Sequence, residues 1–152
     1  MKDDYMSLAL AEAKAAAENG EVPVGAVIVG PDGTVLAQAR NTMRSDHDPT
    51  AHAEMAAIRA ACAAIGNERL IDCDLYVTLE PCPMCAGAIA EARIRRLYYG
   101  AADMKGGAVD NGVALFAQKS CHHKPEVIGG MRESDCAALL KAFFALRRNG
   151  QD

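Results

Sequence analysis

The chain has 152 residues, 51% of them hydrophobic, and a formal net charge of −4. This length accommodates one domain with a substantial core and is too short for two, so we expect a single domain over residues 1–152. No charged and then apolar leader opens the chain, and no apolar run approaches the roughly 20 residues that span a bilayer, which predicts a cytoplasmic protein without a membrane partner.

The first elements are predicted to be a helix and a β-hairpin. Residues 4–18 are rich in alanine and end at an Asn-Gly pair, which is typical of a helix and its C-terminal cap. Residues 24–29 are apolar and β-branched, and residues 34–39 alternate after a Pro-Asp-Gly turn. These two runs predict paired strands, followed by a loop that begins at Asn41.

A second helix and a third strand are expected in the middle of the chain. Residues 50–65 carry apolar side chains at helical spacing and end at a glycine. Thr50 is the expected N-cap, so His52 would lie in the first helical turn. Residues 74–79 form a short apolar run that predicts a strand.

The remaining residues repeat this alternation. Small residues over 86–92 predict a helix, residues 94–99 predict a strand, and residues 100–112 read as a long loop. Helices are expected near residues 113–118 and over residues 134–148, the last of them capped by its first residue, a serine. Alternating strands and helices favour an α/β layered fold, with ligands bound at the carboxyl edge of its sheet.

Three side chains have the spacing of metal ligands. Cys82 and Cys85 lie three apart after a proline, which suits a helix start, where the helix dipole favours thiolates. His52 also lies near a predicted helix start. One histidine and two cysteines leave the fourth tetrahedral position of a zinc ion for water, whose pKa falls from about 15.7 to roughly 7. This pattern predicts a catalytic zinc site.

Glu54, two residues after the histidine, is the candidate general acid and base. A free carboxylate beside the metal can exchange protons during turnover, whereas a carboxylate that binds the metal cannot. By itself, a Cys-x-x-Cys pair is more often a structural zinc knuckle or a redox pair, but a closed site would need further ligands. Glu80, just before the cysteines, suits a structural hydrogen-bonding role better than a catalytic one.

Four further cysteines are expected to be core residues or free thiols. The apolar content does not call for disulfides, and the chain has no secretion signal. A second metal site at the Cys-His-His run of residues 121–123 is not favoured, nor is a ligand role for His47. The four residues are Cys62, Cys73, Cys121 and Cys136.

Charge is distributed unevenly along the chain. Residues 1–91 hold six Lys/Arg against 14 Asp/Glu, whereas residues 92–148 hold ten Lys/Arg against five Asp/Glu. A local basic region can attract a polyanion even on an acidic protein, although solvated helix faces also produce such an excess. Charge alone therefore leaves RNA binding open.

Together the motifs resemble those of a known family. The blocks Asp48–Glu54 and Tyr76–Cys82 are similar to the cytidine deaminase-like superfamily, and Glu21–Ala26 with Phe143–Arg148 extend the similarity to bacterial tRNA-specific adenosine deaminases. The resemblance implies a cytidine deaminase-like fold, in which helices cover a central mixed five-stranded sheet.

The resemblance also implies an activity. The expected reaction is hydrolytic deamination of adenosine to inosine at wobble position 34 of a tRNA, with an arginine tRNA as the substrate. Each subunit of a homodimer would hold one Zn²⁺ with a bound water or hydroxide as its fourth ligand. By the resemblance, the RNA and substrate contacts would come from five residues: Asn41, Asp103, Lys105, Phe144 and Arg148.

Two rival functions remain. A deaminase of a free base or nucleoside, such as guanine or cytosine, would use His52, Glu54, Cys82 and Cys85 in the same way. A noncatalytic zinc-stabilised RNA-binding module would need the metal but not Glu54. The basic C-terminal region favours a polynucleotide over a free base.

Overall fold

A mixed five-stranded sheet forms the centre of the protein in the computed structural model, which describes residues 2–148. The strand order is β2-β1-β3-β4-β5. β1 is antiparallel to both β2 and β3, whereas β3, β4 and β5 run parallel. The expected α/β fold is confirmed. The strands are β1 (Gly25–Val29), β2 (Val35–Arg40), β3 (Asp74–Leu79), β4 (Arg96–Ala101) and β5 (Glu126–Ile128).

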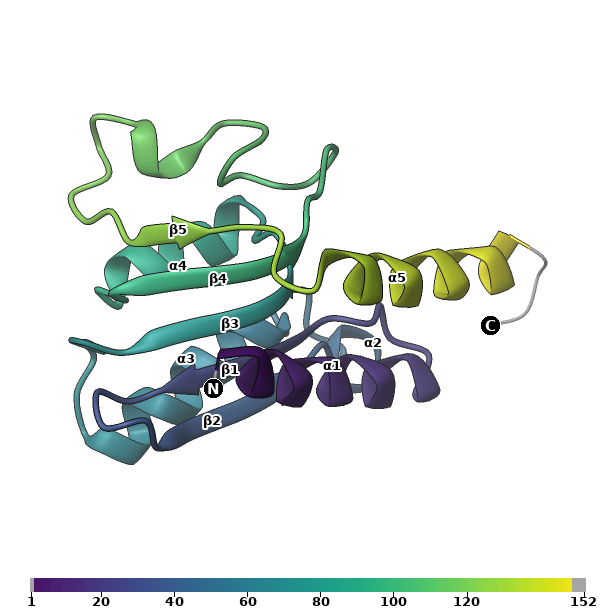
Figure 1. Cartoon of the computed structure of the whole chain (residues 1–152), viewed down its shortest axis with the longest axis horizontal. Helices are drawn as coiled ribbons and strands as arrows, with labels where there is room; N and C mark the ends of the chain where they lie inside the picture. Colours follow the sequence, from purple (N-terminus) through teal and green to yellow (C-terminus); the bar gives the residue numbers. More distant parts are fainter. Residues whose placement is uncertain (1, 149–152) are drawn as a thin grey trace.

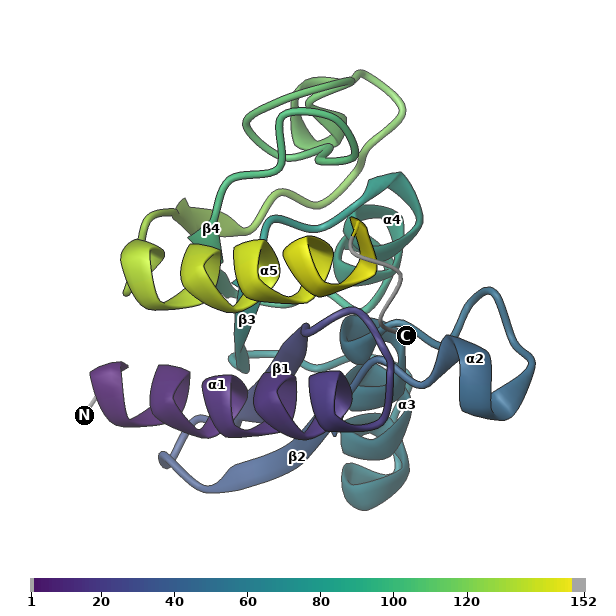
Figure 2. The same cartoon turned by 90° about the vertical axis from the view of Figure 1, so that its right-hand side faces the viewer.

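Helices cover both faces of this sheet. α1 (Lys2–Glu18) and α5 (Glu133–Arg148) lie side by side on one face, and α3 (Ala53–Ile65) and α4 (Pro83–Glu91) lie on the other (Figures 1 and 2). The short helix α2 (Met43–Asp46) precedes α3, and the 3-10 turn η1 (Leu115–Ala117) lies in the loop between β4 and β5.

Alternate strand residues build two separate cores. Val27, Tyr76 and Tyr98 pack under α1 and α5, and the two tyrosine rings stack with their centroids 4.4 Å apart. Ile28 and Val77 point to the opposite face and pack with α3 and α4. Because both faces are buried, the central strands are apolar at nearly every position instead of at alternate ones.

Two elements were not predicted from the residue pattern. β5 has only three residues, two of them apolar, so it shows no alternation that would indicate a strand. α2 has four residues and no buried side chain. The helix expected over residues 113–118 is instead the three-residue turn η1.

Several element boundaries differ from the predictions, among them the starts of β4 and α5. β4 begins two residues later than predicted, because Arg93 adopts a left-handed turn (φ 62°) and Ile94 donates its N–H to Ile89 at the end of α4. α5 begins at Glu133, so Ser134 lies inside its first turn instead of capping it.

None of the helices within residues 2–148 is both long and apolar enough to cross a membrane.

Candidate active site

The two cysteines are presented by the turn from β3 into α4. β3 ends at Leu79, and α4 begins at Pro83, whose fixed φ suits the first helical position. Cys82 is the N-cap residue in extended conformation, and Cys85 lies buried in the first turn. The parallel strand therefore delivers both sulfurs to the carboxyl edge of the sheet, as the sequence predicted.

The histidine is placed by a helix start that differs from the prediction. α3 begins at Ala53, so His52 is its N-cap residue and does not lie in the first helical turn. Thr50 lies two residues before this N-cap position, and its hydroxyl and its N–H both donate to the Asp48 carboxylate, at 2.7 and 2.8 Å. Instead, the Asn41 side-chain oxygen accepts the N–H of Ala53 at 2.8 Å, which fixes the orientation of the helix start.

The three predicted ligands converge. The Nδ1 atom of His52 lies 3.6 Å from the Cys82 sulfur and 3.4 Å from the Cys85 sulfur, and all three ligand atoms lie within 4.8 Å of one another. Ligands bound tetrahedrally at about 2.0 Å for nitrogen and 2.3 Å for sulfur lie roughly 3.5 Å apart, so these residues fit zinc. Within residues 2–148 this is the only group of three or more such side chains that could hold a metal ion.

The cysteine pair favours one thiolate. A hydrogen bond from the Cys85 thiol lowers the pKa of Cys82 to about 4, with a further contribution from His52. The same hydrogen bond, together with burial, raises the pKa of Cys85 well above its usual range. The hydrogen bond with Cys82 also raises the pKa of His52. Cys82 is therefore the cysteine that ionises more readily, and the thiolate is the form of cysteine that a zinc ion binds.

Glu54 lies beside the cluster, in the first turn of α3. It is 4% exposed, and it lines a cavity of about 170 Å³ together with His52 and Cys82. Burial, which removes water from the carboxylate, raises the pKa of Glu54 to about 7. A buried carboxyl that lines the same cavity as the metal ligands suits a proton carrier.

Of the five residues expected to contact RNA, two line this cavity and three lie further out. Asn41 and Asp103 line the cavity that also holds Glu54. Lys105, Phe144 and Arg148 line a neighbouring cavity of about 780 Å³, which Asp103 also lines. The structure therefore places all five on the walls of two cavities that share Asp103.

Glu80 organises the loop after β4. Its carboxylate is 2% exposed and accepts the N–H groups of Asp103, Val109, Asp110 and Asn111, as well as the Asn111 side-chain amide, at 2.7 to 3.1 Å. Burial opposes ionisation, but these hydrogen bonds outweigh it and hold the pKa of Glu80 below its usual value. The predicted hydrogen-bonding role of Glu80 is confirmed.

Several residues of the cavity wall were not identified from the sequence. Val22, Val24 and Leu79 supply apolar wall, and Met43 reaches the cavity from α2. Isolated apolar residues carry no sequence signal that separates a cavity wall from an ordinary core. All six cysteines are free thiols, including Cys73 and Cys136, which are buried.

The chain is similar to proteins of known activity. The family model of the cytidine and deoxycytidylate deaminase zinc-binding region matches residues 1–101. A tRNA-specific adenosine deaminase of Agrobacterium fabrum is 58% identical over 144 residues, which cover 95% of this chain and 94% of that protein. A tRNA-specific adenosine deaminase of Bacillus subtilis is 46% identical over 140 residues, with 92% and 86% covered. A structure solved in a study of A-to-I editing by tRNA:A34 deaminases at the wobble position has a TM-score of 0.88 and 59% identity, covering 90% of this chain and 99% of that chain.

Proposed function

This chain belongs to the tRNA-specific adenosine deaminases, within the family of the cytidine and deoxycytidylate deaminase zinc-binding region, and from that premise we propose that it converts adenosine to inosine at the wobble position of a tRNA. One observation carries the proposal. The buried Glu54 carboxylate lines the same small cavity as His52 and Cys82, and this cavity adjoins a larger one lined by cationic and aromatic side chains.

The reaction divides between the metal and one carboxyl group. His52, Cys82 and Cys85 would hold a zinc ion, which would supply a water of lowered pKa as the nucleophile. Glu54 accepts a proton from that water and passes it to N1 of the adenine ring. The protonated ring accepts the water oxygen at C6, and Glu54 carries the second water proton to the exocyclic amino group. That group then departs as ammonia and the product is inosine.

The inner cavity suits one base. Its volume of about 170 Å³ is below the roughly 300 to 1,000 Å³ of sites for drug-sized ligands. An unstacked base from an anticodon loop enters such a site without the cost of opening a duplex. The side-chain oxygen of Asn41 already accepts the N–H of Ala53. We therefore expect the NH₂ group of Asn41 to donate to the substrate.

The outer cavity suits the nucleotides that flank the target. Phe144 is 41% exposed, and its ring offers a face on which a base can stack. Lys105 and Arg148 provide positive charge for neighbouring phosphates. From the family resemblance, we also propose an arginine tRNA as substrate, a homodimer, a cytoplasmic location and a single deaminase domain over residues 1–152.

Competing substrates test this function. The zinc-loaded protein is incubated with an anticodon stem-loop that carries adenosine at position 34, and separately with adenosine, guanine and cytosine. We expect inosine in the stem-loop and no deamination of the small substrates, with Glu54→Gln as the inactive control. Deamination of guanine or cytosine together with an unchanged stem-loop would identify a free-base deaminase instead.

A further inference from the structure

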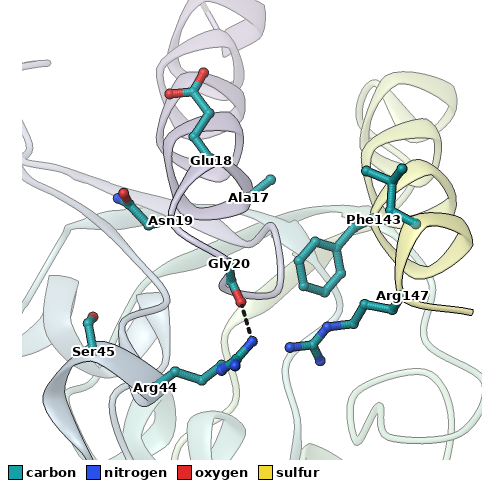
Figure 3. Close-up of a pocket in the computed structure, with 9 residues that line it drawn as sticks. Ala17, Glu18, Asn19, Gly20, Arg44, Ser45, Phe143 and Arg147 are labelled. Atoms are coloured by element: carbon teal, nitrogen blue, oxygen red, sulfur yellow. Dashed lines mark hydrogen bonds between the residues drawn. The ribbon is translucent and has the colours of Figure 1, made fainter. Parts of the chain in front are cut away.

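A buried carboxylate joins the end of α1 to the helix α2. Glu21, just after α1, is 1% exposed. Its Oε1 atom accepts the N–H of Arg44 at 3.0 Å, and its Oε2 atom accepts the N–H and the hydroxyl of Ser45 at 2.8 and 3.1 Å. The Arg44 guanidinium also donates to the Gly20 carbonyl at 3.2 Å (Figure 3). These four hydrogen bonds tie α2 to the segment that connects α1 with β1.

The position of α2 depends on hydrogen bonds more than on apolar packing. None of its four residues is buried, and Figure 2 shows the helix set apart from the two helical layers. Isolated helices shorter than roughly 12 residues are unstable in water, so α2 needs partners elsewhere in the chain. Burial opposes ionisation of Glu21, but the N–H donors of Arg44 and Ser45 hold its pKa below the usual value. The bonds to Glu21 are therefore charge-assisted at neutral pH.

The two segments that Glu21 joins are both walls of the inner cavity. Val22 and Val24, which follow Glu21, line this cavity, and so do Asn41 and Met43 at the start of the α2 segment. Glu21 itself is not part of the wall. Its carboxylate therefore sets the spacing between two walls of the cavity from behind them.

Met43 is the residue of α2 that lines the inner cavity. At the start of α2, Thr42 donates its N–H to the Ala51 carbonyl at 3.0 Å, which ties the base of the segment to the residue before His52. The bonds to Glu21 begin at Arg44, the residue after Met43, and fix the direction in which α2 leaves that base. A methionine side chain is flexible, so the placement of its backbone decides how closely it confines a base.

We propose that Glu21 is a positioning residue of the deamination site, which acts through α2 to hold Met43 against the target base. The role rests on the tRNA deaminase function proposed above. A base confined between Met43 and the valine wall keeps its orientation toward Glu54, the proton carrier. Orientation of this kind accelerates a reaction, and a misplacement of about 1 Å can lower the rate about 100-fold.

Replacement of Glu21 by Gln tests this role. A glutamine has one acceptor oxygen, so its NH₂ group would face the N–H of either Arg44 or Ser45, which is also a donor. The measurement is single-turnover deamination of an anticodon stem-loop by the zinc-loaded full chain. At saturating RNA we expect the rate to fall about 10- to 100-fold. The zinc content should not change, and the RNA dissociation constant should change less than about threefold, because phosphate contacts dominate affinity.

The matched control is Glu12→Gln. Glu12 lies on α1, its side chain is 23% exposed, and its carboxylate lies 3.6 Å from the Arg40 guanidinium. This variant removes a carboxylate from the same helix–sheet region but leaves the anchor of α2 intact. It should deaminate the stem-loop at the wild-type rate.

Met43→Ala separates positioning from a general loss of stability. Met43 is only partly buried, so its replacement should leave the fold intact and remove part of the cavity wall. We expect this variant alone to lower the single-turnover rate about tenfold or more. Glu21→Gln should lower the rate no further when Met43 is already alanine, because Glu21 acts through that side chain. Its effect on the urea unfolding midpoint should nevertheless be the same in both backgrounds.

Three results would overturn the positioning role. The first is a wild-type rate at saturating RNA in Glu21→Gln or in Met43→Ala; the second variant decides the matter if the first does not fold. The next is a double variant whose loss is the product of the two single losses, which would show that the residues act separately. The last is a raised RNA dissociation constant with an unchanged rate at saturation, which would make α2 an RNA anchor instead.

In all three cases the wild type still deaminates the stem-loop, so the proposed function stands. A wild type that leaves the stem-loop unchanged would instead reject the proposed function, and the positioning role with it.

Discussion

Replacement of Glu80 by Gln tests how the loop over the site is held. The two carboxylate oxygens of Glu80 share five hydrogen bonds: Oε2 accepts three backbone N–H groups, and Oε1 accepts the Asp103 N–H and the Asn111 side-chain amide. In the least damaging placement of a glutamine, its NH₂ group replaces Oε1. The hydrogen bonds from the Asp103 N–H and the Asn111 side-chain amide are then lost, and both of these donors face the NH₂ group of the glutamine, which is itself a donor.

The expected destabilisation follows from this count. A hydrogen bond to a charged group contributes about 1.5 to 3 kcal/mol, so loss of two corresponds to about 3 to 6 kcal/mol in the free energy of unfolding. The Glu80 carboxylate is buried, so water cannot replace the missing partners. Deamination should fall as well, because Asp103 and Gly106 of the released loop line the inner cavity.

Urea unfolding of the zinc-loaded protein measures this difference. The midpoint should fall without a change in the dependence on urea concentration. Glu126→Gln is the matched control: Glu126 has a 62% exposed side chain and bonds to Arg96 at 2.8 Å, so its replacement should cost less than about 1 kcal/mol. A loss below about 1 kcal/mol for Glu80→Gln would refute the role assigned to the five hydrogen bonds.

The same carboxylate should make stability depend on pH. The pKa of Glu80 is lower in the folded protein than its ordinary value of 4.5, so the unfolded chain binds this proton more readily. The stabilisation is therefore complete above pH 4.5 and is lost as the pH falls through the lower folded pKa. The difference in unfolding free energy between wild type and Glu80→Gln should stay constant from neutral pH to about pH 5 and shrink below it. A constant difference down to about pH 3 would contradict the lowered pKa.

Three further predictions concern the metal, the proton carrier and one close approach of backbone. Glu54→Gln should keep its zinc, measured by metal analysis, and lose at least about 10²-fold in deamination rate; near-wild-type turnover would mean that another group carries the proton. Removal of zinc by a chelator should abolish inosine formation and lower the unfolding midpoint, and added zinc should restore both; activity in fully metal-free protein would contradict a catalytic zinc. Gly25→Ala should destabilise the protein by about 3 kcal/mol, because its Cβ would overlap the Ala9 carbonyl oxygen on α1. The control Gly87→Ala meets nothing within 4 Å and should be neutral or stabilising by about 0.5 to 1 kcal/mol in urea unfolding, since alanine is the better helix former; equal effects of the two would refute the steric argument.

Features that depend on neighbouring residues were predictable from the sequence. The spacing of Cys82 and Cys85 after a proline fits a helix start, and that local geometry sets where both sulfurs point. Runs of apolar and β-branched residues predict the four longer strands. The convergence of His52 on the cysteines from a different helix was inferred from donor types, and the distances between these side chains agree with it.

Features that depend on contacts between residues distant in the chain were not predictable from the sequence. Helix α2 is anchored by Glu21, which accepts N–H groups more than 20 residues away, and no local pattern indicates that contact. Thr50 has the side chain of an N-cap, but the helix begins at Ala53, and the Thr50 hydroxyl donates to the Asp48 carboxylate instead. β5 is too short for periodicity to show, and only the family resemblance supplied a fifth strand. The cavity walls at Met43 and Val22 likewise exist only after tertiary packing.

Sequencing of a complete tRNA pool after incubation with the zinc-loaded protein tests the central claim most directly. Inosine reads as guanosine in complementary DNA, so every adenosine in every tRNA is examined at once. The account predicts conversion at wobble position 34 alone, in tRNAs that carry adenosine there, and none with Glu54→Gln. Conversion at many unrelated adenosines, or none in any tRNA with fully metal-loaded protein, would contradict it.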